Sequence, residues 1–154
     1  MDCAARIALL CGGTMAEGWA CYATDLMDEI GFLTPLERYA QIHARLRMAA
    51  RALIDIDLHH GVCSLDDAAA FYERRAGLSA EAARAEAVKN SMFPGTAMMY
   101  MVGTNLIHEL RRDLSRSPAF DLRGFHDRFL SFGSVPVAWV CAAMREEYAD
   151  RSGR

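Results

Sequence analysis

The feature that most constrains the fold is a helix-start signal followed by a long apolar repeat. Thr34, Pro35 and Glu37 supply an N-cap side chain, a proline at the first helical position and a glutamate at the third, a combination typical of the beginning of an α-helix. Apolar residues then recur at three- and four-residue spacing; they are Ile42, Leu46, Ala49, Leu53 and Ile56. Because this spacing places them on one face, the sequence predicts a long helix over residues 35–59.

Helical periodicity and helix-ending residues continue along the rest of the chain. Ser64 and Ser79 are further N-cap candidates, and Gly77 is a candidate helix stop. No run alternates apolar and polar residues over the length of a strand. The other expected helices cover residues 3–11, 15–30, 65–76, 80–92, 96–115 and 122–132, with a last one ending near residue 148. The sequence therefore predicts an all-α fold of seven or eight helices in a single helical domain, residues 1–154.

The composition argues against several classes of protein. The 154 residues are 53% apolar and 24% charged, with a formal net charge of −3 and interspersed signs. A disordered chain would be less apolar, and a nucleic-acid or anionic-lipid surface would need clustered basic residues. No apolar run approaches the roughly 20 residues that span a bilayer. We therefore expect neither nucleic acid nor a membrane as a partner.

The cysteines and the N-terminus bear on the compartment. Five cysteines are widely spaced and form no C-x-x-C pair, which favours reduced, buried thiols over a disulfide framework or a zinc knuckle. The apolar stretch over residues 4–11 is interrupted by Arg6 and has no basic segment before it, unlike a signal peptide. The sequence predicts a cytoplasmic protein.

Four motifs follow one another along the chain and resemble a known family. They are Met15-Ala16-Glu17-Gly18-Trp19-Ala20-Cys21-Tyr22, Asp55-Ile56-Asp57-Leu58-His59, Pro94-Gly95 followed by Tyr100 and Gly103, and Phe120-Asp121-Leu122-Arg123-Gly124-Phe125-His126-Asp127. In this order they resemble the C-terminal portion of the bacterial family called domain of unknown function 885, whose members resemble helical zinc metallopeptidases. The resemblance covers residues 14–145. It implies that the chain is the C-terminal part of a larger, helical, zincin-like metallopeptidase domain.

The resemblance also implies a zinc site to which this chain contributes one ligand. In the family a His-Glu-x-x-His helix precedes the segment containing Glu17, and Glu17 occupies the position of the third metal ligand. This sequence has no His-Glu-x-x-His, and its nearest string, which begins at His108, ends in arginine. Because one carboxylate does not hold zinc against water, we expect zinc in the family but none bound by this chain alone. The chain is then a truncated reading frame, a fragment or a degenerate relative. From the residues alone, Glu17 is a solvated helical glutamate.

Four further residues are candidates for a site. By resemblance, His59 and Tyr100 would donate hydrogen bonds to the oxyanion that forms when water attacks a peptide carbonyl. The alternatives are a histidine favoured by the end of its helix and a half-buried tyrosine with a bonded hydroxyl. Arg51 and Arg111 are candidates for binding a substrate carboxylate, although Arg51 is expected first to pair with Asp55, four residues later on the same helix.

Three functional hypotheses follow. The first is the C-terminal helical portion of a zinc metallopeptidase, inactive alone and acting on a peptide substrate when a chain carrying the zinc motif completes it. The second is a non-catalytic helical binding or assembly module derived from that fold, its apolar surface covered by a partner or by homo-oligomerisation. The third is a hydrolase with Cys63 or Ser64 as nucleophile and His59 or His60 as base, although Ser64 also suits a helix cap.

Overall fold

The computed structural model describes residues 12–152, and the secondary structure within this range is entirely helical. The helices are α2 (Gly13–Glu29), α3 (Pro35–His59), α4 (Leu65–Ala76), α5 (Ala80–Met92), α6 (Met98–Leu114), α7 (Leu122–Ser131) and α8 (Val137–Ser152). The all-α prediction is confirmed, and the helix expected over residues 3–11 lies outside the described residues. None of the described helices is long and apolar enough to cross a membrane.

The predicted helix starts and stops are confirmed where capping side chains define them. The Thr34 hydroxyl accepts a hydrogen bond from the Glu37 N–H at 3.3 Å, and the Glu37 carboxylate accepts one from the Thr34 N–H at 2.8 Å. This capping box begins α3 at the expected residue. Ser64 forms a second capping box, with Asp67, at the start of α4, and the Ser79 hydroxyl caps α5 by accepting from the Ala82 N–H at 3.3 Å. Gly77 ends α4 with a left-handed φ of 65°.

Three helix ends differ from the predictions by two or more residues, and one of them is the start of α2, at Gly13 rather than at Met15. Helix α6 begins at Met98 rather than at Thr96, because the preceding residues form a turn in which Gly95 has a φ of 77°. The N–H groups of Gly95 and Ala97 are bonded to a side chain of another helix. Helix α8 continues to Ser152, past the predicted end near residue 148, since no glycine or proline occurs before residue 153.

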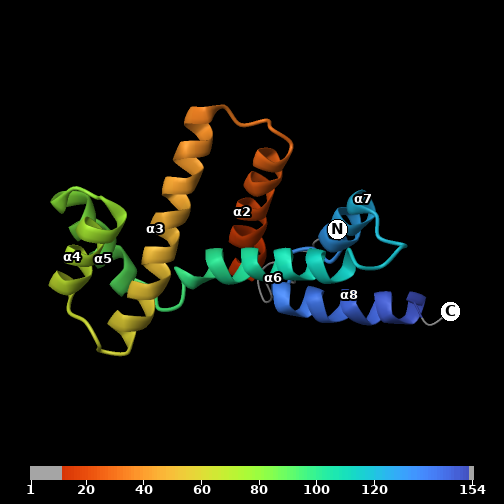
Figure 1. Ribbon diagram of the computed structural model, residues 1–154. Coiled ribbons are helices and arrows are strands. Elements are labelled where there is room, and N and C mark those ends of the chain that lie inside the picture. The colour runs from red at the N-terminus through yellow and green to blue at the C-terminus, as the bar shows by residue number, and fades with distance from the viewer. Residues whose placement is uncertain (1–11, 153–154) are drawn as a thin grey trace. The chain divides into compact units, whose positions relative to one another are not determined.

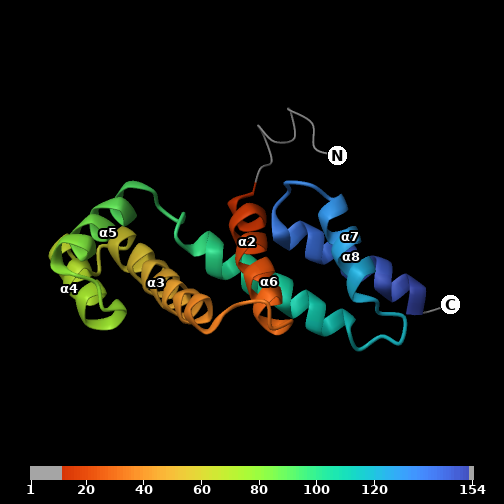
Figure 2. The same cartoon turned by 90° about the horizontal axis from the view of Figure 1, so that it is seen from above.

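The chain divides into two compact units. Unit 1 consists of Met1–Ala23 and Val102–Arg154, and unit 2 of Thr24–Met101. Helices α2 and α6 therefore each contribute residues to both units. In unit 2, α4 and α5 pack beside the C-terminal half of α3 (Figures 1 and 2).

The core of unit 2 is rich in alanine. Its buried residues are Ala50, Ile54, Ala68, Ala69, Tyr72, Ala76, Ala83 and Ala87. Small side chains let α3, α4 and α5 approach closely, and Ile54 and Tyr72 are the larger side chains of this set that fill the space between them.

Unit 1 depends on a backbone crossing between α2 and α6. A Cβ atom added to Gly103 would lie 2.2 Å from the carbonyl oxygen of Thr14, and one added to Gly18 would lie 2.6 Å from the backbone of Gly103. The Thr104 hydroxyl donates to the Gly18 carbonyl across the same crossing at 3.3 Å. Glycine is therefore required at both positions of the crossing.

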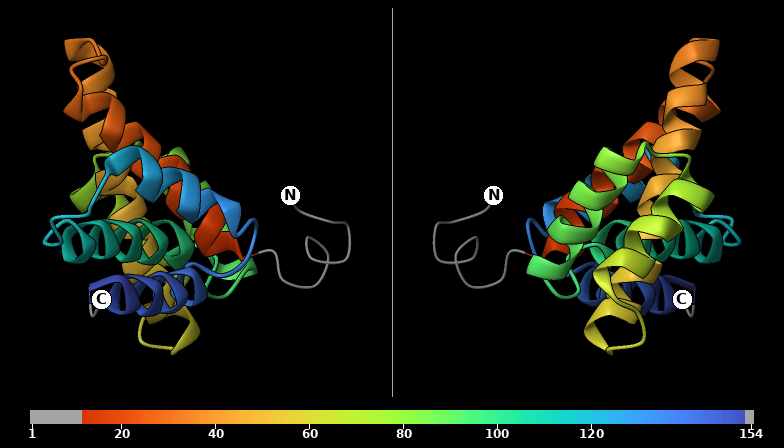
Figure 3. Two further views of the ribbon diagram at one scale, coloured as in Figure 1. Left: turned by 90° about the vertical axis from the view of Figure 1, so that its right-hand side faces the viewer. Right: turned by 90° about the vertical axis from the view of Figure 1, so that its left-hand side faces the viewer.

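In the same unit, helix α8 lies beside α6 (Figures 1 and 3).

Candidate functional site

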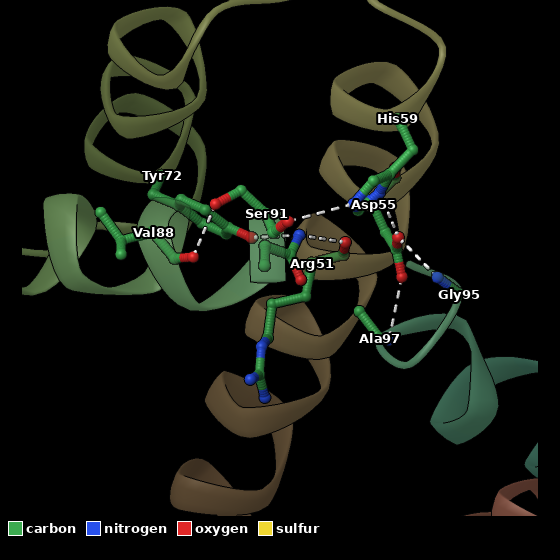
Figure 4. Close-up of polar contacts among 9 residues, drawn as sticks. Arg51, Asp55, His59, Tyr72, Val88, Ser91, Gly95 and Ala97 are labelled. Carbon is green, nitrogen blue, oxygen red and sulfur yellow. Dashed lines mark hydrogen bonds and ion pairs between the residues drawn. The ribbon is translucent and has the colours of Figure 1, made fainter. Parts of the chain in front are cut away.

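Asp55 is the centre of the polar contacts in unit 2 (Figure 4). Its side chain is 2% exposed, and its carboxylate accepts hydrogen bonds from the Gly95 N–H at 2.9 Å and the Ala97 N–H at 3.0 Å. A buried carboxylate is stable only when such donors replace its lost water. These two hydrogen bonds connect the turn before α6 to helix α3, which carries Asp55.

His59 lies one helical turn after Asp55, and each of its two ring nitrogens lies near a hydrogen-bond acceptor. Its Nδ1 is 2.7 Å from the Asp55 carbonyl oxygen and 2.9 Å from the Asp55 carboxylate, and its Nε2 is 3.4 Å from the Ser91 carbonyl oxygen. The bond to the Asp55 carbonyl is the main cause that raises the pKa of His59, and burial opposes it. Only the protonated ring can donate from both nitrogens, so this arrangement favours a cationic donor.

Arg51 pairs with a different residue from the one predicted. Its Nε lies 3.0 Å from Glu86 Oε2, and the two side chains are 14% and 19% exposed. The two atoms are not aligned as a hydrogen bond, so the attraction is between charges. The predicted Arg51–Asp55 ion pair is wrong, because the Asp55 carboxylate is directed at backbone N–H groups and at His59.

Asn90 and Tyr72 extend this network, and the sequence analysis missed both roles. The buried Asn90 amide donates to the Arg51 carbonyl at 2.8 Å and to the Tyr72 hydroxyl at 3.0 Å. Burial raises the pKa of Tyr72, and the Glu86 carboxylate raises it further. A signal was present: Asn90 follows Ala83 and Ala87 at helical spacing, where the apolar face of α5 would otherwise continue.

Arg51 and Tyr100 line the same small pocket in unit 2. The pocket encloses about 60 Å³, and its other lining residues are Lys89, Asn90, Phe93, Thr96 and Ala97. One water occupies roughly 30 Å³ of liquid, so this space admits a small polar group and excludes a peptide side chain of ordinary size. His59 is not among the lining residues. The structure therefore brings two of the predicted site residues together in this pocket.

Glu17 lies in unit 1, on α2, and is half-buried. It makes no hydrogen bond or ion pair with another described residue. No group of three His, Cys, Asp or Glu side chains within residues 12–152 is placed to hold a metal ion. Zinc needs three or four protein ligands, so the described residues alone do not fit a zinc ion, and Glu17 is one carboxylate available to a larger ligand set.

Arg111 also lies in unit 1, within a cluster of aromatic rings. Its Nη1 is 3.4 Å from the hydroxyl of the fully buried Tyr22, and its guanidinium carbon is 5.9 Å from the Tyr22 ring centroid. The same hydroxyl is 2.8 Å from His126 Nε2, and Trp19 stacks on Phe129 at 5.6 Å. These contacts join α2 to α6 and α7, so Arg111 has a structural role in unit 1.

Cys63 and Ser64 do not have the surroundings of an activated nucleophile. The Ser64 hydroxyl accepts from the Asp67 N–H and donates to the Asp67 carboxylate at 2.6 Å, as a helix cap. Burial raises the pKa of Cys63, and the nearby carboxylates of Asp57 and Asp67 raise it further. A nucleophilic thiol needs a lowered pKa, so the geometry opposes the third hypothesis.

Comparisons with known proteins agree with the resemblance seen in the sequence. The family described as bacterial protein of unknown function, domain of unknown function 885, matches residues 4–144. No curated protein matches the chain.

Two solved structures contain the fold of this chain within longer proteins. One is a candidate lipoprotein from Colwellia psychrerythraea, with 27% identity over 90% of this chain and a TM-score of 0.82. The other is a candidate lipoprotein of unknown function from Shewanella oneidensis, with 27% identity over 86% of this chain and a TM-score of 0.77. This chain spans 24% and 25% of their lengths. About three-quarters of each solved protein therefore has no counterpart here.

Proposed function

This chain belongs to the bacterial family called domain of unknown function 885, and from that membership we propose that it is the C-terminal helical portion of a zinc metallopeptidase. In this proposal Glu17 is the third metal ligand, and His59 and Tyr100 donate hydrogen bonds to the oxyanion of a peptide substrate. Arg51 and Arg111 are retained as substrate-binding candidates. The observation that carries the proposal is the family match over most of this chain. In addition, this chain corresponds to only about a quarter of the length of each solved relative.

The environment of Glu17 supports its assignment as a ligand. A half-buried carboxylate without a hydrogen bond or ion pair among the described residues is free to bind a cation. The described residues supply no group of three possible ligands, and in this proposal the remaining ligands come from other polypeptide. We therefore expect this chain alone to be inactive and to bind no zinc.

The contacts of Asp55 support the assignment of the two donors. Its carboxylate holds the ring of His59 and also the backbone of Gly95 and Ala97, which leads into the first turn of α6 where Tyr100 lies. One buried group therefore contacts His59 and the turn that precedes Tyr100, and in this proposal Asp55 is a positioning residue for both donors. The Nδ1 of His59 is committed to Asp55, so donation to an oxyanion would come from Nε2, in place of its 3.4 Å contact with the Ser91 carbonyl oxygen. An oriented donor stabilises an oxyanion better than a mobile one.

The two arginines have weaker support. A substrate carboxylate at Arg51 would compete with Glu86, whose carboxylate is already 3.0 Å away. A substrate at Arg111 would compete with the contact to the Tyr22 ring and hydroxyl. Charge-assisted contacts to a carboxylate are strong enough for such an exchange, so both residues stay candidates.

The alternative is a non-catalytic binding or assembly module, and one observation favours it. Several large apolar side chains of unit 2 are more than half exposed, among them Phe32, Tyr39 and Ile42, and such surfaces on soluble proteins are generally contact sites.

The cytoplasmic location predicted from the sequence remains part of either proposal. The candidate lipoprotein descriptions of the two solved relatives make cell fractionation the appropriate test of it.

A zinc titration tests the metallopeptidase proposal. The wild-type chain and its Glu17→Gln variant are titrated with zinc against a chromophoric chelator, alone and with a saturating synthetic helix that contains His-Glu-x-x-His. Glu29→Gln, an exposed glutamate of the same helix, is the matched control. We expect no stoichiometric zinc with the chain alone. With the peptide we expect one zinc, bound about tenfold or more weakly by Glu17→Gln. Stoichiometric zinc on the chain alone, or affinity with the peptide that does not depend on Glu17, would contradict the proposal.

A further inference from the structure

One face of α3 is apolar and exposed along most of the helix. Its large residues are Tyr39, Ile42, Leu46, Leu53 and Ile56, which are between 42% and 67% exposed, and Ala49 completes their spacing. Successive members are three and four residues apart, the pattern of a seam between two packed helices. We call these six residues the α3 stripe.

The α3 stripe is not the face that α3 uses inside unit 2. The buried residues of the helix are Ala50, Ile54 and Asp55. Ala50 and Ile54 face the core formed with α4 and α5, and Asp55 accepts hydrogen bonds from the turn before α6. Helix α3 therefore carries apolar residues beyond the face that α4 and α5 cover, and an exposed apolar surface of this length is generally a contact site.

The middle of the α3 stripe adjoins a groove with positive charge on one wall. Leu46, Ala49, Ala50 and Leu53 form the α3 wall, and Phe71, Arg74 and Arg75 form the α4 wall of a hollow of about 300 Å³. Both arginines are exposed, and neither makes a hydrogen bond or ion pair with another described residue. The groove thus combines an apolar floor with two exposed cations, of which Arg74 also helps to lower the pKa of Asp67.

A second copy of this chain is a poor occupant for this groove. Between residues 38 and 54, α3 contains no aspartate or glutamate and four arginines, at positions 38, 45, 47 and 51. Arg38, Arg45 and Arg51 are paired with Asp28, Asp25 and Glu86. This stretch of another copy would therefore offer Arg74 and Arg75 no carboxylate of its own, and its remaining arginine would add a like charge, which disfavours association. The charge of the groove calls for a negatively charged helix.

We propose that the α3 stripe and its groove dock an amphipathic α-helix whose apolar residues repeat at three- and four-residue spacing and whose flank carries aspartate or glutamate against Arg74 and Arg75. The helix would come from the part of the family's proteins that this chain does not contain, an assignment that rests on the proposed function. The solved relatives have such polypeptide, because this chain covers only 24% and 25% of them.

Two synthetic helices test the docking. Both have 21 residues with leucine at every seam position; one carries glutamate and the other lysine at the flanking positions. Each is labelled and titrated with the full wild-type chain by fluorescence anisotropy in the presence of EDTA. We expect the glutamate helix to bind about tenfold or more tightly than the lysine helix at low salt, with the difference shrinking as salt is added.

Variants assign the binding to the groove. The double variant Arg74→Glu with Arg75→Glu should reverse the preference between the two helices, and Leu46→Glu with Leu53→Glu should abolish binding of both. Val88→Glu replaces a similarly exposed apolar residue on α5 and should change neither affinity. Circular dichroism checks that each variant remains folded, which is expected because all the changed side chains are exposed.

Three results would overturn the proposal. They are absence of binding by either helix, equal affinity for both, and a preference that survives reversal of the two arginines. Sedimentation equilibrium addresses the remaining occupant, since a dimer broken by the leucine double variant would mean that a second copy covers the α3 stripe. Because EDTA removes zinc from the assay, a failure here is distinguishable from a failure of the zinc titration, which does not depend on this groove.

Discussion

Replacing Asp55 by alanine should destabilise unit 2 strongly. The substitution leaves the buried Ala97 N–H without its acceptor, which costs about 1–3 kcal/mol. The Gly95 N–H loses the same partner, but Gly95 is exposed and water can replace the carboxylate, so about 1 kcal/mol is appropriate there. The expected loss is therefore about 2–4 kcal/mol, a large share of the roughly 5–15 kcal/mol by which a domain is stable.

Asp57→Ala is the matched control for this prediction. Asp57 lies on the same helix two residues later, and its side chain makes no hydrogen bond or ion pair with a described residue, so its removal should change the unfolding free energy by less than about 0.5 kcal/mol. Urea denaturation followed by circular dichroism at 222 nm measures both variants. If Asp55→Ala matches Asp57→Ala within about 0.5 kcal/mol, the buried carboxylate does not anchor the turn before α6, and the reasoning is refuted.

Three further outcomes are expected. Gly103→Ala should lose about 1–3 kcal/mol because its new methyl group meets the backbone of α2, whereas Asn105→Ala, exposed on the same helix, should be near neutral by the same denaturation assay. Nuclear magnetic resonance titration should give His59 a pKa above the ordinary 6.5. The stabilisation from its protonated ring is then fully present below that ordinary value and is lost as the pH rises through the raised one, and a titration at or below 6.5 would contradict the geometry. Tyr22→Phe removes the hydroxyl bonded to His126 and should cost about 1 kcal/mol; an unchanged denaturation midpoint would show that this bond contributes nothing.

The helices were predictable because their signals are local. A capping box, a proline at the first helical position and a left-handed glycine act within a few residues, so the bounds of α3, α4 and α5 followed from the sequence. The ends of α6 and α8 were less predictable. The start of α6 depends on Asp55, which is 40 residues away from Gly95 in the sequence, and propensity does not report such a contact.

The polar pairing was predictable only in part. Arg51 and Asp55 have the spacing of an intrahelical ion pair, which made that pairing the simplest expectation. In the structure Arg51 instead pairs with Glu86, and the Asp55 carboxylate accepts hydrogen bonds from backbone N–H groups. Several fixed donors stabilise a buried carboxylate more than one flexible cation does. The choice between partners depends on burial, and burial is decided by tertiary packing.

Variants of Asp55 and of Glu17 test different properties, because the first affects the stability of the fold and the second tests zinc binding. Any loss of activity in an Asp55 variant of a completed enzyme would combine instability with misplacement of His59, since the same carboxylate supports the turn and the ring. Glu17 makes no hydrogen bond or ion pair with a described residue, so Glu17→Gln should leave the unfolding free energy within about 0.5 kcal/mol of wild type. A change in zinc affinity at Glu17 can therefore be attributed to the lost ligand. If Glu17→Gln proves strongly destabilising, the glutamate has a structural partner and its availability to a metal fails as an argument.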